Sequence, residues 1–496
     1  MKKIYDGQEM SRMDQWAIQQ AGIPGRTLME RAAQGVVQRI LACGKKRTAV
    51  LCGTGNNGGD GFAIARLLHA QHVPTDVYII GKKEKMNGTT DAAANYQMLA
   101  PLGIPVFWRV PEKTEEYGCI VDALFGTGLS REITGEAERA IGWCNEKRQS
   151  GAYVVAVDIP SGIHSGTGQI LGCAVHADKT VTFSRYKTGL CLYPGREYAG
   201  QIDLQEIGIP RENQIEAEGQ KYLFEREDAV QSLPPRQIDS HKGTYGKVLV
   251  AAGSPGMMGA AVFAAKAAYH TGTGLVRTVI PQKESAVMTL SVPEAVQILY
   301  EDPSQVRISS DVTAAVVGPG LGNHEELFFQ ILRELPEEVP LVVDADGLNI
   351  LARHSGMRRP GMILTPHMGE ASRLTGRSAK ALLADLPAAA VSLARQYEAV
   401  VVLKGAATVT ADPWGRIAVN TTGNPGMSTA GSGDVLAGTI AGLCAQQGDG
   451  DLWKTAACGV WLHGRAGDRA AEEVGQYALT ASDIIRFLRP DHLILS

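Results

Sequence analysis

The sequence predicts an α/β protein with two domains, each built around a parallel β-sheet. Short apolar runs alternate with segments of helical spacing along the chain, and glycine-rich segments follow several of those runs. The chain has 496 residues, more than one hydrophobic core usually serves. Polarity rises at 210–220, between two alternating series. We therefore expect a linker there and domains at 1–215 and 222–496.

The first series begins with helical spacing over 11–40, interrupted by a Gly-Ile-Pro-Gly segment. A strand at 48–52 leads into a glycine-rich loop and then a helix over 62–70. Further short apolar runs predict strands at 76–80, 119–122, 153–158 and 179–183. Turn residues follow each run, which is typical of a three-layer domain with helices packed on a parallel sheet.

The second series follows the expected linker and carries different motifs, which indicates a fusion rather than a duplication. An Asp-Pro-Trp-Gly turn between 408–410 and 417–419 predicts a hairpin. Helices are expected over 435–445 and 453–471. The remaining strands are predicted at 247–251, 275–280, 314–317, 341–343, 362–364 and 400–403.

Composition narrows the function classes. A net charge of −4 gives no electrostatic case for binding nucleic acid or an anionic membrane. The eight cysteines are scattered without a Cys-x-x-Cys pair, so neither a zinc site nor a redox pair is indicated. The first residues lack the apolar stretch of a signal peptide, and no apolar run is long enough to span a bilayer. We expect a cytoplasmic protein with reduced thiols, which forms a homo-oligomer.

The most informative segment is the small-residue run 423–434, which ends in Gly431-Ser432-Gly433-Asp434 and leads into a helix. Backbone N–H groups at a helix N-terminus can bind an anion. An acid beside a phosphate would repel it, so Asp434 is better explained as a base acting on a substrate hydroxyl near a phosphate. The alternative is that Asp434 only caps the helix.

In the first half, three loops with acids follow predicted strands. They read Gly-x-Gly-Asn-Asn-Gly-Gly-Asp-Gly at 53–61, Asp-Ala-Leu-Phe-Gly-Thr-Gly-Leu at 122–129 and Asp-Ile-Pro-Ser-Gly at 158–162. The carboxyl ends of parallel strands meet at one edge, so the loops should converge on one crevice. Any one of them alone could be a turn with a capping aspartate.

These three motifs, in this order, resemble the NAD(P)H-hydrate epimerases across about residues 1 to 215. The resemblance implies a Rossmann-like domain in which Asp158 is the acid–base group and Lys187 a second candidate. It implies a potassium ion held by Asn57, Asp122 and Ser161, whose oxygens suit a hard cation. The implied hydrate-binding residues are Asn56, Asn57, Gly58, Gly59, Asp60, Gly126, Thr127, Gly128, Leu129, Ser130, Arg131, Glu132 and Asp158.

The second half contains His-Lys-Gly-x-x-Gly at 241–246, Gly-Pro-Gly-Leu-Gly at 318–322, Thr-Pro-His-x-Gly-Glu at 365–370 and Lys-Gly-x-x-Thr at 404–408. A lysine at a strand end, such as Lys404, can meet phosphate charge. His367 could equally be a packed core histidine, although its motif favours a functional role.

Together with the 423–434 segment, these motifs resemble the ADP-dependent NAD(P)H-hydrate dehydratases, which are ribokinase-like. Ala430 stands where that family usually has glycine, so the match requires a backbone without positive φ there. The match implies that Ala260, Gly322, His367 and Asp434 contact the hydrate. It implies an anion hole made by Gly431, Ser432 and Gly433, and a site for the adenine nucleotide (ADP or AMP) at Lys404, Gly405, Ala406, Ala407, Thr408 and Gly433.

The two resemblances imply repair of hydrated NADH and NADPH. One domain would epimerise the R and S hydrates at C6, and the other would use ADP and Mg²⁺ to dehydrate the S hydrate, giving AMP and phosphate. Asp434 would take the hydroxyl proton while the anion hole holds the transferred phosphoryl group. Ring opening and reversible hydroxide loss both remain open as routes of epimerisation. The alternative is a small-molecule kinase for a vitamin or sugar, fused to a non-catalytic nucleotide-binding module.

Overall fold

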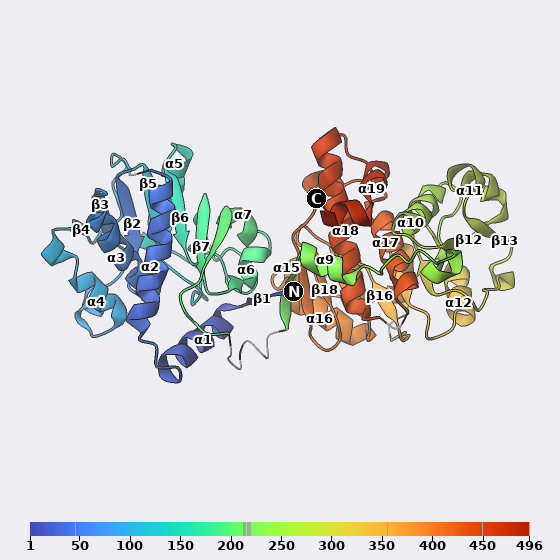
Figure 1. The fold of residues 1–496 in the computed structure, drawn as a ribbon, viewed down its shortest axis with the longest axis horizontal. Coiled ribbons are helices and arrows are strands. Elements are labelled where there is room, and N and C mark those ends of the chain that lie inside the picture. Colours follow the sequence, from blue (N-terminus) through green and yellow to red (C-terminus); the bar gives the residue numbers. More distant parts are fainter. Residues whose placement is uncertain (45, 212–214, 216–219, 355, 449, 496) are drawn as a thin grey trace. The chain divides into compact units, whose positions relative to one another are not determined.

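The computed structural model describes residues 1–44, 46–211, 215, 220–354, 356–448 and 450–495, and the chain divides into two compact units (Figure 1). One unit is Lys3–Lys221, and the other combines Met1–Lys2 with Tyr222–Ser496. The first two residues belong with the second unit because the Met1 amino group lies 2.6 Å from Asp228 and Lys2 lies 3.0 Å from Glu225. Of the expected linker, 212–214 and 216–219 lie outside the described residues.

The sheet of the Lys3–Lys221 unit is parallel and has the order β4-β3-β2-β5-β6-β7-β9. All the strands predicted for this half form, within one residue of the expected bounds. The strands are β2 (Thr48–Cys52), β3 (Thr75–Ile79), β4 (Val106–Phe107), β5 (Cys119–Ala123), β6 (Tyr153–Val157), β7 (Lys179–Phe183) and β9 (Gln201–Gln205). A short parallel pair joins β1 (Lys2–Tyr5) and β8 (Tyr186–Lys187).

Helices cover both faces of this sheet, because successive strand residues point to opposite sides. Val50 packs with α2 and α3, whereas Leu51 packs with α5. This confirms the three-layer arrangement. The helices are α1 (Gly7–Gln19), α2 (Gly25–Ala42), α3 (Asn56–Ala70), α4 (Asp91–Gln97), α5 (Glu136–Gln149), α6 (Thr188–Cys191) and α7 (Gly195–Ala199).

The second unit holds a larger sheet, in which β13-β12-β11-β14-β15-β16-β17 are parallel neighbours and β18 and β19 follow as the predicted antiparallel hairpin. The prediction missed β10 and β13. The strands are β10 (Lys221–Phe224), β11 (Lys247–Ala251), β12 (Leu275–Pro281), β13 (Val296–Tyr300), β14 (Ala314–Val317), β15 (Leu341–Val343), β16 (Met362–Leu364), β17 (Val400–Leu403), β18 (Val409–Ala411) and β19 (Ile417–Asn420).

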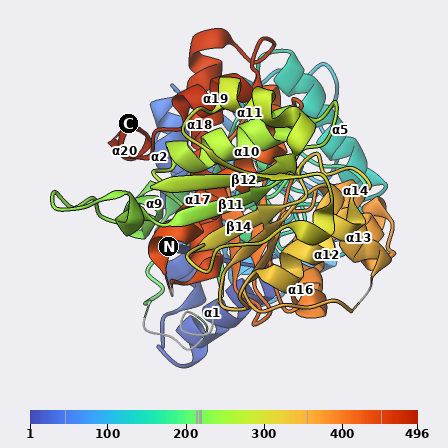
Figure 2. The same ribbon diagram turned by 90° about the vertical axis from the view of Figure 1, so that its right-hand side faces the viewer.

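Helices also lie on both sides of this sheet, and Figure 2 shows α10 and α12 on opposite sides of β11, β12 and β14. The helix α17 is apolar nearly all round, because it is buried between α10, α18 and the sheet. The helices are α9 (Arg226–Ser232), α10 (Met258–His270), α11 (Ser285–Ser291), α12 (Glu325–Glu334), α13 (Asp346–Arg353), α14 (Met368–Thr375), α15 (Ala379–Leu383), α16 (Leu386–Tyr397), α17 (Ser432–Gln447), α18 (Leu452–Val474), α19 (Ala481–Phe487) and α20 (Pro490–Leu495).

Each sheet reverses its strand order at one point, and this determines where a ligand can bind. The reversal lies between β2 and β5 in the first unit and between β11 and β14 in the second. In open α/β sheets the crevice forms at the carboxyl ends of the strands flanking that point. Within the described parts of the chain, none of the helices combines the length and apolar character needed to cross a bilayer.

Candidate active sites

The glycine-rich segment after β2 is helical in the structure, which corrects the expected loop and helix start at 62. The helix α3 begins at Asn56, directly after Gly55. A Cβ at Gly58 would lie 1.9 Å from the Gly53 carbonyl oxygen, and one at Gly59 would lie 2.9 Å from the Ala92 Cα. These glycines therefore allow the helix to approach its neighbours closely, and they do not line the cavity beside it.

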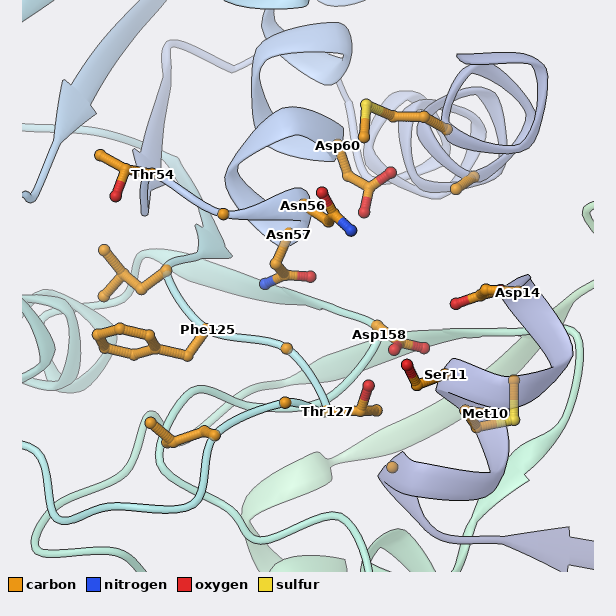
Figure 3. Close-up of a pocket in the computed structure, with 18 of the residues that line it drawn as sticks. Met10, Ser11, Asp14, Thr54, Asn56, Asn57, Asp60, Phe125, Thr127 and Asp158 are labelled. Carbon is orange, nitrogen blue, oxygen red and sulfur yellow. The ribbon is translucent and has the colours of Figure 1, made fainter. Parts of the chain in front are cut away.

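A cavity of about 920 Å³ opens at the carboxyl ends of β2 and β5, and we call it the first site (Figure 3). Asn56, Asn57 and Asp60 reach it from the first turns of α3, and Asp158 reaches it from the end of β6. From the loop after β5 come the predicted residues Gly126, Thr127, Gly128, Leu129, Ser130 and Arg131, together with Phe125. The next residue, Glu132, does not line the cavity.

Asp158 is held by a dense set of donors. Its Oδ1 accepts hydrogen bonds from the Phe183 N–H at 3.0 Å and the Thr182 hydroxyl at 3.3 Å, and it is ion-paired with the Lys187 ammonium. Lys187 is 1% exposed and also donates to the Phe183 carbonyl at 2.9 Å. Asp158 has φ +68°, a left-handed conformation that costs a non-glycine residue about 1 kcal/mol or more. The backbone thus directs this carboxylate into the cavity.

The sequence analysis missed Asp14, which enters the cavity from α1. Figure 3 shows Asp14, Asp60 and Asp158 pointing into the same space from separate elements. Desolvation by the cavity walls, and then the charge of Asp158, raises the pKa of Asp14 to about 6. Burial, followed by the charges of Asp158 and Asp14, raises the pKa of Asp60 well above its usual value. The overlooked signal was an acid beside the apolar stripe of buried Met10, Met13 and Ala17 on α1.

Of the expected potassium ligands, Asn57 lines the cavity, whereas Asp122 and Ser161 lie behind its wall. Asp122 is fully buried, and its carboxylate accepts the Ser161 N–H at 2.7 Å and the Ser161 hydroxyl at 2.6 Å. Burial raises the pKa of Asp122 to about 6, although these hydrogen bonds oppose the shift. Asn57 is buried beside Gly126, and its side-chain nitrogen finds no hydrogen-bond partner among the described residues.

A second cluster of charged residues, which we call the second site, lies at the carboxyl ends of β15–β17. Lys404, at the end of β17, lies 2.7 Å from the Asp344 carboxylate and 3.9 Å from that of Glu370. Gly433 is adjacent, because a Cβ there would lie 3.4 Å from Lys404 Nζ and 3.5 Å from Asp344 Oδ2. The cluster therefore brings the lysine of the 404–408 segment to the 431–434 segment.

Asp434 lies in the first turn of α17 and is not its cap. Gly431 is the N-cap, with φ +87°, and α17 begins at Ser432. Burial, followed by the charge of Asp344, raises the pKa of Asp434 to about 7, while Lys404 opposes the shift. This suits a base that must accept a proton near neutral pH. Ala430 does not have positive φ, so its side chain is compatible with the turn.

His367 is neither a core residue nor free, because it caps α14. The His367 Nδ1 accepts the backbone N–H of Gly369 at 2.9 Å, and the His367 backbone N–H donates to the Glu370 carboxylate at 2.8 Å. Burial and the nearby Lys404 and Arg373 lower the pKa of His367, which keeps Nδ1 available as an acceptor. The side chain is 55% exposed, and its backbone lies beside Lys404. The cap places Glu370 next to Lys404.

The remaining predicted residues of this half lie on the loops after β14 and β17 and in the first turns of α10 and α17. Gly322 has φ +65° and donates its N–H to Asp346, beside a cavity of about 390 Å³. Ala260 packs against the neighbouring Gly320. In the 404–408 segment, Gly405 and Ala406 are exposed, whereas Ala407 and Thr408 are buried and the Thr408 hydroxyl closes the loop onto the Gly405 carbonyl at 3.1 Å. Ser432 lies 3.4 Å from His463, a buried histidine that the sequence analysis did not predict.

Both halves of the chain are similar to known proteins. A family model described as NAD(P)H-hydrate dehydratase matches residues 248–490, and one described as YjeF-related protein N-terminus matches residues 25–189. The bifunctional NAD(P)H-hydrate repair enzyme Nnr of Thermofilum pendens is 39% identical, covering 98% of this chain and 95% of that protein. The enzyme with the same description from Coxiella burnetii is 37% identical, covering 99% of both. The chain belongs to the bifunctional NAD(P)H-hydrate repair enzyme family.

A solved relative establishes the fold of the second unit. The ADP/ATP-dependent NAD(P)H-hydrate dehydratase of Bacillus subtilis, co-crystallised with ATP and Mg²⁺, is 31% identical with a TM-score of 0.51. It covers 55% of this chain and 98% of its own. This confirms the predicted ribokinase-like fold. The second site lies within the range that the dehydratase model matches, and most of the first site lies within the range that the YjeF-related model matches.

Proposed function

We propose that this chain repairs hydrated NADH and NADPH, with an epimerase at the first site and an ADP-dependent dehydratase at the second. The observation that carries the proposal is the position of Asp434, in the first turn of α17 and in the same charged cluster as Lys404 and Asp344. A base, a cation and the N–H groups of a helix N-terminus are what phosphorylation of a hydroxyl requires. The family membership supports the pairing with an epimerase.

At the second site, ADP supplies the phosphoryl group. Asp434 accepts the proton of the C6 hydroxyl as that oxygen attacks the β-phosphorus, and AMP leaves. The N–H groups of Gly431, Ser432 and Gly433 hold the transferred charge, and Lys404 neutralises the phosphates. The lone pair of ring N1 then expels phosphate to give the N1=C6 iminium, and loss of a C5 proton to water or to the departing phosphate restores the C5=C6 double bond as the N1=C6 electron pair returns to N1. The 404–408 segment shapes the nucleotide side, and Ala260, Gly322 and His367 contact the hydrate.

Mg²⁺ fits the second site through carboxylates and substrate. Magnesium in such sites binds one or two carboxylates together with phosphate oxygens and water. Asp344 and Glu370 supply two carboxylates beside Lys404, and no cluster of three or more metal-binding side chains occurs among the described residues. When bound, the ion would neutralise phosphate charge. The solved Bacillus subtilis relative was crystallised with ATP and Mg²⁺, which supports this assignment.

At the first site, Asp158 is the acid–base group that acts on the C6 hydroxyl, with Lys187 stabilising its charge. The side chains of Asn56, Asn57 and Asp60 and the loop 126–131 bind the hydrate. K⁺ fits the oxygens of Asn57, Asp122 and Ser161, because the buried Asp122 carboxylate accepts hydrogen bonds but has no ion-pair partner among the residues described. When bound, the ion would supply that charge and fix the loop after β5.

The first experiment measures recovery of reduced-nicotinamide absorbance from a mixture of both NADH-hydrate epimers, with ADP and Mg²⁺. We expect full recovery, faster than spontaneous epimerisation allows. Recovery of only one epimer would support the dehydratase activity and contradict the epimerase activity. No recovery with ADP or ATP, together with turnover of ATP on a vitamin or sugar, would replace the proposal with a kinase.

The second experiment tests Asp158 itself. The Asp158→Asn variant removes the charge but keeps the shape, so we expect epimerisation to fall by about 100-fold or more with hydrate binding retained. The retained hydrate binding is the control for folding of the first unit, and dehydration of the pure S hydrate shows that the second unit is unaffected. Unchanged epimerisation would remove Asp158 from the mechanism.

A further inference from the structure

Three carboxyl groups and one ammonium share one end of the first site. Asp14 comes from α1, Asp60 from α3, Asp158 from the end of β6 and Lys187 from β8. A single lysine cannot balance three carboxylates, and like charges in a shared site keep protons bound. Burial and the neighbouring carboxylates therefore raise the pKa of both Asp14 and Asp60.

The surroundings of these groups separate their roles. One oxygen of Asp158 accepts hydrogen bonds from the Lys187 ammonium, a backbone N–H and a hydroxyl. Asp14 faces Asp60 and Asp158, and the cavity walls and the charge of Asp158 raise its pKa to about 6. Lys187 opposes that shift. An acid and a base whose surroundings separate their proton affinities are the arrangement that proton-transfer enzymes use.

Asp14 is also accessible to a substrate. Its side chain is exposed to the open cavity, on α1, while Asn56 and Asn57 line the cavity from α3. A bound hydrate would displace water from Asp14 and bring the reacting ring against its carboxyl group. Buried structural acids, such as Asp122, have no such access.

We propose that Asp14 is the general acid of the epimerase and donates its proton to the departing C6 oxygen of the hydrate, while Asp158 is the base for the water that returns. This rests on the proposed epimerase function of the first site. The C6–O bond breaks and its electron pair leaves on the oxygen, which takes the Asp14 proton and departs as water. The lone pair of ring N1 forms the N1=C6 bond.

The reverse steps complete the epimerisation. Water adds to the opposite face of C6, the N1=C6 electron pair returns to N1, and the proton of the added water goes to Asp158. That proton returns to Asp14 through cavity water, so no proton is gained or lost overall. The step needs no oxidant or co-reactant, and it makes the C6 oxygen of the product come from solvent.

The principal test compares Asp14→Asn with the wild-type full chain, using the pure R hydrate of NADH without ADP and separating the epimers by chromatography. We expect kcat for epimerisation to fall about 100-fold or more, with KM within about threefold. In the wild type, kcat/KM should fall about tenfold per pH unit above pH ~6, and the variant should lack this decline. Asp14→Glu should restore part of the rate and the decline.

Two controls separate a chemical role from a structural one. Gln15→Ala changes the next residue of α1, which does not line the cavity, and should epimerise at the wild-type rate. Retained hydrate binding by Asp14→Asn reports whether the first unit folds, because dehydration of the S hydrate reports only on the second unit. A variant that loses rate but keeps the wild-type pH profile, or one that keeps its rate within threefold, would overturn the assignment of Asp14.

Isotope labelling tests the step as written. In ¹⁸O-water, wild-type epimerisation should place label at C6 in each product molecule, above an enzyme-free control. Epimerisation without label would overturn hydroxyl loss, and with it the role of Asp14 as acid to that oxygen. No enzymatic epimerisation by the wild type would instead refute the proposed function of the first site, so the two failures are distinguishable.

Discussion

Both sites lie at the carboxyl ends of parallel strands, the first at β2 and β5 and the second at β15–β17, yet their glycine-rich segments work differently. After β2, Gly58 and Gly59 are inside α3 and allow close packing, so the side chains of Asn56, Asn57 and Asp60 face the cavity. Before α17, Gly431 adopts a left-handed conformation as the N-cap and Gly433 faces Lys404. A glycine-rich helix start can therefore serve packing at one site and leave backbone N–H groups available to a ligand at the other.

The two sites also differ in their charged side chains. The first site places Asp14, Asp60 and Asp158 together, with Lys187 paired to Asp158, which suits proton transfer. The second pairs Lys404 with Asp344 and Glu370 at a helix N-terminus, which suits phosphate transfer. The side chains beside the glycine-rich segments therefore determine which of the two reactions each site suits.

The largest expected effect is at the second site, where it tests whether Asp434 is the base. Asp434→Asn removes the proposed base without changing its size, so the dehydratase kcat should fall by roughly 1,000-fold. Turnover of the S hydrate with ADP and Mg²⁺ measures this, and epimerisation by the same protein is the control. A fall below tenfold would mean that Asp434 is not the base.

The next largest effect tests whether α3 glycines serve packing. Gly58→Ala places a methyl group 1.9 Å from a backbone oxygen, so it should destabilise the first unit by roughly 3 kcal/mol. Denaturant unfolding with epimerase activity as the probe measures the change. Gly142→Ala is the matched control, because this helical glycine has nothing within 4 Å, and it should be neutral or stabilising by about 1 kcal/mol.

Sequence reasoning predicted strands better than site geometry, and particular residues show why. Strands such as 48–52 and 314–317 were found with correct bounds, because apolar runs between turns are a local signal. The start of α3 at Asn56 was missed, because glycines indicate a loop unless one knows that Gly53 and Ala92 lie against them. Asp14 was missed because its neighbours in the cavity are distant in sequence. The roles assigned to the site residues stay predictions.

The pH profile of the dehydratase tests the charges at the second site. The pKa of Asp434 is raised to about 7 by burial and Asp344, and a base must be ionised. Dehydratase kcat/KM should therefore rise about tenfold per pH unit below pH ~7 and level off above it. Asp344→Asn removes the repelling charge, so the midpoint should move to lower pH. A midpoint that stays in place would indicate that another group limits the rate.

The smallest expected effect is at Gly433. A Cβ there meets only the mobile end of Lys404 and the Asp344 carboxylate, at 3.4 and 3.5 Å. Gly433→Ala should therefore change stability by no more than about 1 kcal/mol, while displacing the lysine and raising KM for ADP about fivefold. Gly438→Ala, on the same helix, puts a Cβ 2.2 Å from the Ala264 carbonyl oxygen and should instead destabilise the second unit. If Gly433→Ala unfolded the protein as readily as Gly438→Ala, the glycines of α17 would serve packing as those of α3 do, and the distinction between the two sites would fail.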